Sequence, residues 1–376
     1  MREHSADRDG MTSMAVAHPR LPSWTTLAPI LAMIALALVW GRDIGPVVVG
    51  IVAVLLAAAV LSAVHHAEVV AHRVGEPYGS LVLAVSVTVI EVALIVTLMA
   101  SGGPEVATLA RDTVFAALMI TTNGILGLSL LLASRRHGTA HFNRDGTGAA
   151  LATALTLAVL SLVVPTFTST PGPEFTGPQL VFAAVASLVL YLLFVSTQAK
   201  THRNFFLPVD AEGGLLELDH ASPPSHRAAW WSFGLLLVAL VAVVGLAKVE
   251  SPVLEAAVRA VGLPHAFVGV LIALLVLAPE TLAAARAARR GRTQISLNLA
   301  LGSAMASIGL TIPTIAVASI WLEGPLHLGL GSLHMALLAV TAVVAILTVV
   351  PGRATRLQGG VHLVLFASYV FLAANP

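Results

Sequence analysis

Eleven long apolar segments constrain the fold more than any other feature of this sequence. A helix that crosses a lipid bilayer needs about 20 predominantly apolar residues. Polar or turn-forming residues separate the segments, and the strict alternation that a membrane β-barrel requires is absent. We therefore predict an all-α integral membrane protein with eleven transmembrane helices. The predicted spans are residues 24–40, 46–64, 79–100, 113–133, 148–166, 178–198, 230–247, 265–285, 295–321, 332–350 and 360–374.

The composition excludes a water-soluble enzyme. Only 10% of the 376 residues are charged and 57% are hydrophobic, and the mean hydropathy is +0.91, whereas soluble domains carry about 25% charged residues. Most of the surface must contact lipid, so the bilayer is an expected partner. A net charge of +1 provides no basic field for nucleic acid, and the absence of cysteine excludes thiolate metal sites and cysteine nucleophiles.

The basic residues of the loops predict the orientation, because cytoplasmic loops of membrane proteins are enriched in Lys and Arg. With the N-terminus inside, 16 of the 20 basic residues fall on the cytoplasmic side and 4 fall outside. This arrangement predicts a cytoplasmic tail at residues 1–23, which lacks a signal-peptide pattern, a cytoplasmic loop at 199–229 and a C-terminus outside.

Two acidic residues stand out by their depth in the membrane. Glu91 and Glu280 lie inside predicted spans, whereas the other 17 acidic residues fall in loops or at span ends. An ionisable side chain at the centre of a membrane helix costs about 2.5–3.5 kcal/mol on insertion scales, so it is a functional candidate by default. No Lys or Arg lies at a comparable depth to pair with either glutamate.

The positions of the two glutamates predict an inverted repeat. Glu91 lies on the third span and Glu280 on the eighth, and an odd separation of five spans makes the two units cross the membrane in opposite directions. The predicted organisation is an extra first helix at 24–45, a first five-helix half at 46–198 and a second at 230–376. Inverted halves with a site at the midplane are the architecture of many secondary transporters.

Polar residues near the glutamates form a candidate cation site. Each glutamate-bearing span is followed by a span rich in small and polar residues, the first with Asn123 and the second with Ser303 and Ser307. Thr88 shares a helical face with Glu91. These oxygens are candidate ligands for a cation or acceptors for a proton. Packing is the alternative role for any single hydroxyl, because such groups commonly bond to carbonyls of their own helix.

A pair of buried carboxylates suits exchange of a cation for a proton. Burial disfavours the charged form of a carboxylate, so a proton or a cation must neutralise Glu91 and Glu280. Ca²⁺ binds about six to eight oxygen ligands, and Pro279 adds a carbonyl that its missing N–H leaves free. The residues predict a cation/proton antiporter that needs no resident cofactor. Residue chemistry does not rank Ca²⁺ against Na⁺ or K⁺, and it makes no prediction of the oligomeric state.

A second polar cluster lies at the cytoplasmic end of the second predicted span, with His65, His66, Glu68, His72 and Glu76. One interpretation is a mouth that collects protons or cations, since histidine titrates near neutral pH. A plainer interpretation is an interfacial turn in which polar side chains meet lipid headgroups.

Two other classes of membrane protein remain as alternatives. A channel would pass ions without proton coupling. An intramembrane metal-dependent hydrolase would use the histidine cluster as metal ligands, but it needs further His or Asp deep in other spans. His265, His334 and His362 are expected only at span edges, so the sequence disfavours the hydrolase.

Motifs in both halves resemble a known family. Residues 75–81 and 86–92, with 111–113 and 122–124, resemble the first repeat of bacterial ChaA-type calcium/proton antiporters, and 296–313 resembles the second. These proteins belong to the calcium/cation antiporter superfamily, and the resemblance covers nearly the whole chain after the first span. It implies a multi-pass protein of the bacterial inner membrane that exports Ca²⁺, or Na⁺ or K⁺, in exchange for protons.

The resemblance also implies roles for individual residues. The paired acidic residues of the family correspond to Glu91 and Glu280, its first-repeat amide to Asn123, and its second-repeat hydroxyls to Ser303 and Ser307.

Overall fold

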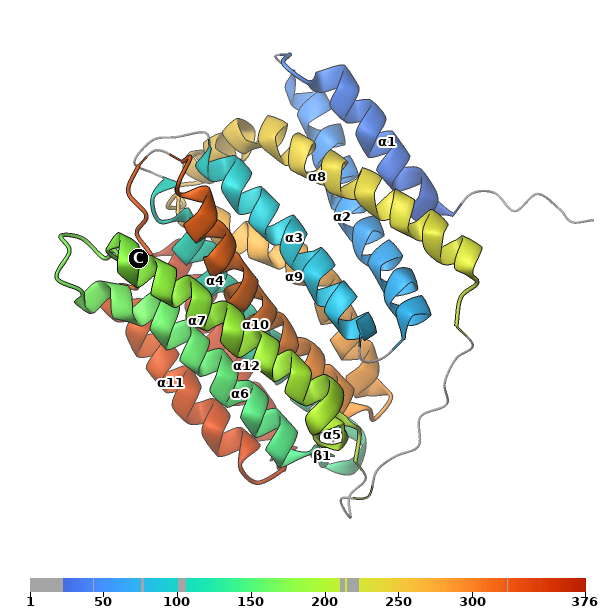
Figure 1. The fold of residues 1–376 in the computed structure, drawn as a ribbon, viewed down its shortest axis with the longest axis vertical. Helices are drawn as coiled ribbons and strands as arrows, with labels where there is room; N and C mark the ends of the chain where they lie inside the picture. The colour runs from blue at the N-terminus through green and yellow to red at the C-terminus, as the bar shows by residue number, and fades with distance from the viewer. Residues whose placement is uncertain are drawn as a thin grey trace, which may run out of the picture.

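The computed structural model describes residues 23–376, apart from 43, 76–77, 101–105, 210–213, 215–222 and 323. The chain is almost entirely helical (Figure 1). The α-helices are α1 (Trp24–Val39), α2 (Pro46–Val74), α3 (Tyr78–Met99), α4 (Leu109–Met119), α5 (Leu126–His137), α6 (Arg144–Ala158), α7 (Gly177–Ser196), α8 (His226–Ala260), α9 (Phe267–Arg289), α10 (Thr293–Ala318), α11 (Ser332–Val349) and α12 (Arg356–Ala374).

Short irregular helices and two strands complete the described secondary structure. π-helical turns cover Ile120–Ile125, Val159–Val163 and Thr197–Thr201, and 3₁₀ turns cover Val164–Phe167 and Arg203–Phe206. Strand β1 (Thr139–His141) pairs antiparallel with β2 (Arg353–Thr355).

The predicted all-α membrane fold is confirmed. The π turn Ile120–Ile125 joins α4 and α5 into one continuous span, and α6 continues through two irregular turns. In the described part of the chain, nine helical segments are long and apolar enough to cross a membrane. The shorter apolar helices Trp24–Val39 and Val85–Met99, the latter a segment of α3, bring the spans to the eleven predicted.

The helices of the two halves interlock at the centre of the bundle. α3 packs against α10, and α9 packs against α4 and α5, so each glutamate-bearing helix lies beside the polar helix of the opposite half (Figure 1). Gly269 of α9 permits this closeness, because a Cβ there would lie 2.9 Å from the backbone nitrogen of Thr113 on α4.

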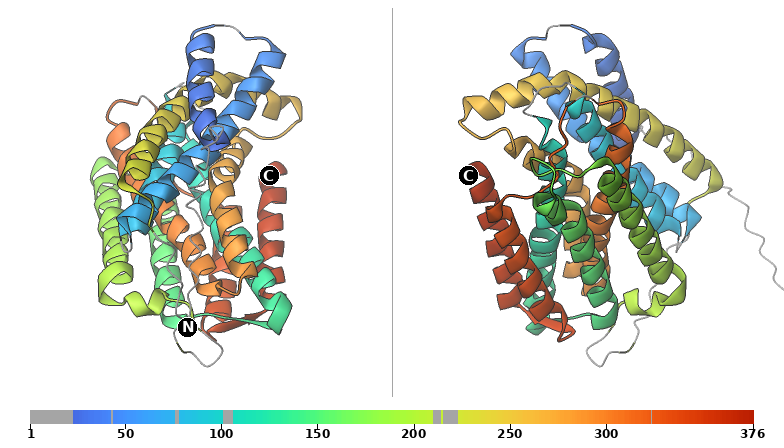
Figure 2. Two further views of the ribbon diagram at one scale, coloured as in Figure 1. Left: turned by 90° about the vertical axis from the view of Figure 1, so that its right-hand side faces the viewer. Right: turned by 60° about the vertical axis from the view of Figure 1, so that its left-hand side comes forward.

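The outer helices lie on opposite sides of this centre. α1 packs against α2 and α8, and these three helices form one flank, whereas α11 and α12 lie at the other side (Figures 1 and 2). Helices at the periphery expose large apolar side chains, such as Phe182 and Leu193 of α7. Such a surface requires lipid as its solvent.

Loops predicted to share a side of the membrane share one end of the molecule. At one end β1 pairs with β2, and the Gln294 side chain accepts a hydrogen bond from the backbone of Asn143. At the other end Arg111 donates to the carbonyl of Gly329, and Thr166 donates to that of Leu330. The alternation of the spans therefore agrees with the prediction, while the assignment of one end to the cytoplasm stays a prediction.

Two spans extend furthest beyond their predicted limits. α2 continues to Val74 and not to residue 64, so His65, His66, Glu68 and His72 are helical and do not form an interfacial turn. α8 continues to Ala260 and not to 247, which places Glu250 inside a helix. In both cases the apolar stripe ends before the helix does, because a long helix continues as long as its backbone hydrogen bonds are satisfied.

Candidate cation-binding site

Glu91 and Ser307 meet at the contact between α3 and α10. The Ser307 hydroxyl donates a hydrogen bond to Oε1 of Glu91 at 2.6 Å, and both side chains are only 2% exposed. The two residues are 216 positions apart and belong to opposite halves. The structure therefore brings together two residues that the sequence predicted for one site.

Glu280 lies on α9 and is 7% exposed. Its Oε2 has no hydrogen-bond partner among the described residues. Glu91 and Glu68 are the acidic residues whose negative charges act on its carboxyl group. Pro279 lacks the N–H that would bond to the carbonyl of Leu275 one turn earlier in this helix.

The two glutamates occupy equivalent places in their helices. Each lies thirteen residues after the first residue of its helix, which is Tyr78 in α3 and Phe267 in α9. This equivalence is what two inverted copies of one unit would produce.

Hydroxyl groups line α3 and α10 on both sides of Glu91. Thr88 is buried three residues before Glu91, and Ser303 is partly buried one turn before Ser307. Thr311, one turn after Ser307, is fully buried, and its Oγ1 has no partner among the described residues. Residues four apart share a helix face, so these oxygens form a row along the contact between the two helices.

Asn123 lies in the π turn Ile120–Ile125, and its side-chain amide forms hydrogen bonds with residues other than the two glutamates. Its Nδ2 donates to Oγ1 of Thr341 on α11 at 3.0 Å, and its Oδ1 lies 3.0 Å from Nδ1 of His362 on α12. No hydrogen bond joins it to Glu91 or Glu280 in the part of the chain that the structure describes. The structure thus bonds the amide of Asn123 to side chains of α11 and α12.

The predicted cytoplasmic mouth contains side chains with different environments. His65 and His72 are exposed and Glu68 is half-buried on the same helix, whereas Glu76 lies outside the described residues. Of the described members of this cluster, Glu68 is the one whose negative charge acts on the carboxyl group of Glu280.

His66 has a structural partner of its own. Pro29 in α1 cannot donate to the carbonyl of Thr25, which would otherwise bond within the helix. Instead Ser62 donates to that carbonyl at 2.5 Å, and Nε2 of His66 donates at 2.9 Å. These two bonds attach α1 to α2 and assign His66 a packing role.

The described residues contain no metal cluster that would suit a hydrolase. Within the described ranges, no three His, Asp or Glu side chains are close enough to hold a metal ion. The nearest candidates from the sequence, His65, Glu68 and His72, do not converge.

Sequence reasoning missed two buried polar residues. Glu250 is 8% exposed, and its Oε1 has no partner among the described residues. His362, expected at a span edge, is fully buried, because α12 begins at Arg356 and not at 360. A capping box formed by Thr355 and Gln358 starts this helix, and that pattern was available in the sequence as a signal.

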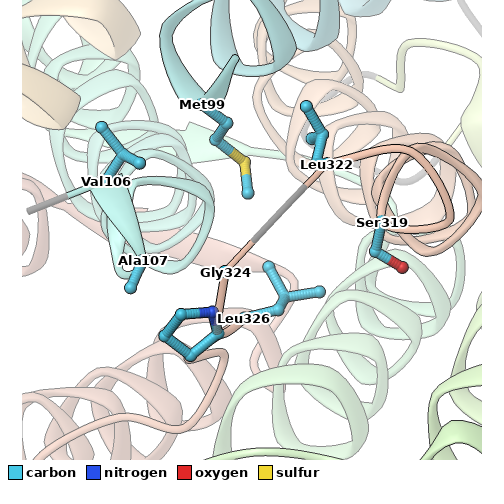
Figure 3. Close-up of a pocket in the computed structure, with 8 residues that line it drawn as sticks. Met99, Val106, Ala107, Ser319, Leu322, Gly324 and Leu326 are labelled. Carbon is cyan, nitrogen blue, oxygen red and sulfur yellow. The ribbon is translucent and has the colours of Figure 1, made fainter. Parts of the chain in front are cut away.

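A small pocket lies beyond the site, at the ends of α3 and α10. Met99 of α3 and Ser319, which follows α10, line it together with the loop residues Gly324 and Leu326 (Figure 3). Its lining is largely apolar. The pocket lies at the end of the molecule opposite Glu68, as the order of residues along α3 requires.

Comparison with known proteins identifies the family. The sodium/calcium exchanger protein family matches residues 44–200 and 231–375, which together make up most of the chain. The chain belongs to this family. It is accordingly a multi-pass membrane cation antiporter, as the sequence predicted.

Relatives of this family member include two bacterial proteins. The putative ionic transporter y4hA of Sinorhizobium fredii is 42% identical and aligns over 96% of this chain and 99% of its own length. The sodium-potassium/proton antiporter ChaA of Escherichia coli is 36% identical over 91% of this chain and 93% of its own.

Solved structures share the fold of this family member. Native YfkE covers 94% of this chain and 99% of its own with a TM-score of 0.69 and 14% identity. The H⁺/Ca²⁺ exchanger CAX covers 93% and 89% with a TM-score of 0.65 and 15% identity. At these identities the likeness concerns the fold alone.

Proposed function

We propose that this protein exchanges a cation for protons at a single site formed by Glu91 and Glu280. The observation that carries the proposal is the pairing of two buried carboxylates from opposite halves, with no ion pair to either among the described residues. Neither carboxylate can stay charged at that depth without a compensating ion.

Competition for the same oxygens would couple the two fluxes. In the protonated state, Ser307 donates to Glu91 and the second carboxylate needs no cation. When a cation enters, both carboxylates lose their protons and ligate it, and the Ser307 hydroxyl turns its lone pairs to the ion. Rocking of the two halves would then open the site to each side in turn.

The first candidate cargo is Ca²⁺. Two carboxylates balance its double charge, and Thr88, Ser303 and Ser307 add neutral oxygens of the kind that Ca²⁺ binds. The names of YfkE and CAX as Ca²⁺/H⁺ exchangers agree with this choice.

Na⁺ or K⁺ is the second candidate cargo, favoured by a specific observation. The amide of Asn123 is bonded to Thr341 and His362, so the site is one neutral oxygen poorer than the sequence predicted. The name of ChaA as a sodium-potassium/proton antiporter agrees with this second choice.

The orientation follows from the loop charges. We propose that the end with Glu68 faces the bacterial cytoplasm, so that Glu68 would draw cations towards Glu280 for export.

Proton movement in liposomes tests the proposal. Purified full-length protein is reconstituted with a pH-sensitive dye inside, and Ca²⁺, Na⁺ or K⁺ is added outside. We expect at least one cation to move protons, and Glu91→Gln and Glu280→Gln each to abolish the movement. Asp145→Asn is the matched control, because Asp145 is an exposed carboxylate near the start of α6.

Two results would overturn the proposal. Exchange that persists in either glutamine variant would exclude a shared two-carboxylate site. Cation flux without any proton movement would instead indicate a channel.

A further inference from the structure

The contact between His362 and Asn123 is a buried polar interaction that the proposed exchange does not use. We propose that His362 sets the cation selectivity of the exchanger by holding the carbonyl oxygen of Asn123 away from the cation. This inference rests on the proposed function, because it names a determinant of selectivity for the Glu91–Glu280 site. His362 is a positioning residue here, since it would act on the cation only through Asn123.

Both ends of the Asn123 amide are occupied by side chains of the last two helices. Oδ1 can only accept, so Nδ1–H of His362 donates to it at 3.0 Å, while Nδ2 donates to Thr341 at 3.0 Å. The second ring nitrogen of His362 lies 3.2 Å from Oγ1 of Thr348. All four side chains are buried. The amide is therefore held in one orientation by hydrogen bonds at both of its ends.

Close packing keeps the imidazole ring in place. A Cβ on Gly127 of α5 would lie 2.8 Å from the Cβ of His362, and a Cβ on Gly359 would lie 2.8 Å from the backbone nitrogen of Leu131. Hence α5 and α12 make a close approach directly beside the ring. A ring in so tightly packed a place cannot swing away without separating the helices.

The position equivalent to Asn123 in the second half makes a different contact. Asn123 and Ser307 each lie fourteen residues after the first residue of α4 or α10. Ser307 contacts Glu91 across the halves, so the equivalent contact of the inverted unit would pair Asn123 with Glu280. Instead, Oε2 of Glu280 has no hydrogen-bond partner among the described residues. His362 is the residue that takes the place of this carboxylate.

The loss of one amide oxygen affects a divalent ion more than a monovalent one. Ca²⁺ needs about six to eight oxygen ligands to replace its hydration shell. With Asn123 withheld, the two carboxylates remain for charge balance, but the number of neutral ligands falls. The contact with His362 should therefore shift selectivity from Ca²⁺ towards Na⁺ or K⁺.

Substitutions of His362 test the role of its hydrogen-bond donor separately from the size of its side chain. His362→Asn keeps an N–H close to the position of Nδ1 and can still donate to Asn123. His362→Leu removes the donor, and His362→Gln moves it to the position of Nε2, near Thr348. The half-saturating concentrations of Ca²⁺ and Na⁺ for proton movement are measured in liposomes for each variant.

We expect the Leu and Gln variants to shift the ratio of these two concentrations by about tenfold in favour of Ca²⁺, because the freed amide oxygen adds a ligand that Ca²⁺ needs more than Na⁺ does. The Asn variant should keep the wild-type ratio. In an Asn123→Ala background, His362→Leu should have no further effect on the ratio, because its target is gone. If His362→Leu fails to fold, His362→Gln still tests the loss of the donor to Asn123.

The outcomes distinguish this inference from the proposed function. Wild-type protein that moves no protons with any cation contradicts the proposed function. Wild-type exchange with an unchanged ratio in the Leu and Gln variants contradicts only the role of His362. The same shift in the Asn123→Ala background would also overturn it, since His362 would then act by another route.

Discussion

The hydroxyl of Ser307 donates a 2.6 Å hydrogen bond to the carboxylate of Glu91 across the contact between α10 and α3. This bond joins the two halves of the protein at the depth where a charge is most costly. It thereby makes the surroundings of the Glu91 carboxylate depend on the position of α10.

Removal of this hydroxyl should weaken exchange. In Ser307→Ala, Oε1 of Glu91 loses its donor and any bound cation loses a ligand, so the half-saturating cation concentration should rise by about tenfold. The matched control is Thr314→Ala on the same helix, because Thr314 is exposed and bonds only to the carbonyl of Leu310. Equal behaviour of the two variants in the liposome assay would contradict a ligand role for Ser307.

Protons and the transported cation should compete for the same two carboxylates. If both bind the carboxylates of Glu91 and Glu280, the half-saturating cation concentration should rise as the pH falls. The steepest rise is about tenfold per pH unit for each proton displaced. Uptake measured at several pH values and cation concentrations tests this. A maximal rate that falls with pH at a constant half-saturating concentration would point to separate proton and cation sites.

His66 should contribute to stability and not to transport. Its ring bonds to the Thr25 carbonyl that Pro29 leaves free, so His66→Phe should lower the stability by about 1–2 kcal/mol and lower the Tm in detergent. His65→Phe is the control, because His65 is the exposed neighbour on the same helix. Loss of exchange in a well-folded His66→Phe protein would restore the interpretation of this cluster as part of the transport path.

The close contact of α4 and α9 should not tolerate a methyl group. In Gly269→Ala the new Cβ would lie 2.9 Å from the backbone nitrogen of Thr113, and a backbone atom cannot move aside as a side chain end can. Overpacking of this kind costs about 1–3 kcal/mol. Gly302→Ala on α10 is the control, since a Cβ there meets no atom within 4 Å. Thermal unfolding of both variants provides the comparison, and equal Tm values would show that the helices can separate freely.

Some features of the site follow from local chemistry and were predictable. Glu91 and Glu280 stand out because a carboxylate within an apolar segment is costly wherever its neighbours lie. Ser307 was predictable as a candidate because it lies on a polar face of the span that follows Glu280. The spans themselves follow from the thickness of the bilayer, which requires long apolar helices whatever their order in space.

The errors have local causes too. The apolar stripe of the seventh span ends near residue 247, but α8 continues to Ala260 and buries Glu250. The last span begins earlier than predicted because the side chains of Thr355 and Gln358 cap α12, and this places His362 two turns inside the helix. Hydropathy measures which residues can enter lipid, whereas hydrogen bonds at the helix ends determine where a helix stops.

By itself, the sequence determined that the chain crosses the membrane as a helical bundle and that two glutamates lie within its apolar spans, and it predicted that the two halves are inverted. Only the tertiary structure decided which partners these groups have. An amide such as that of Asn123 can bond equally well to a carboxylate, a hydroxyl or an imidazole. Its choice of Thr341 and His362 depends on how α11 and α12 pack against the π turn, and no local pattern encodes a contact between residues 239 positions apart.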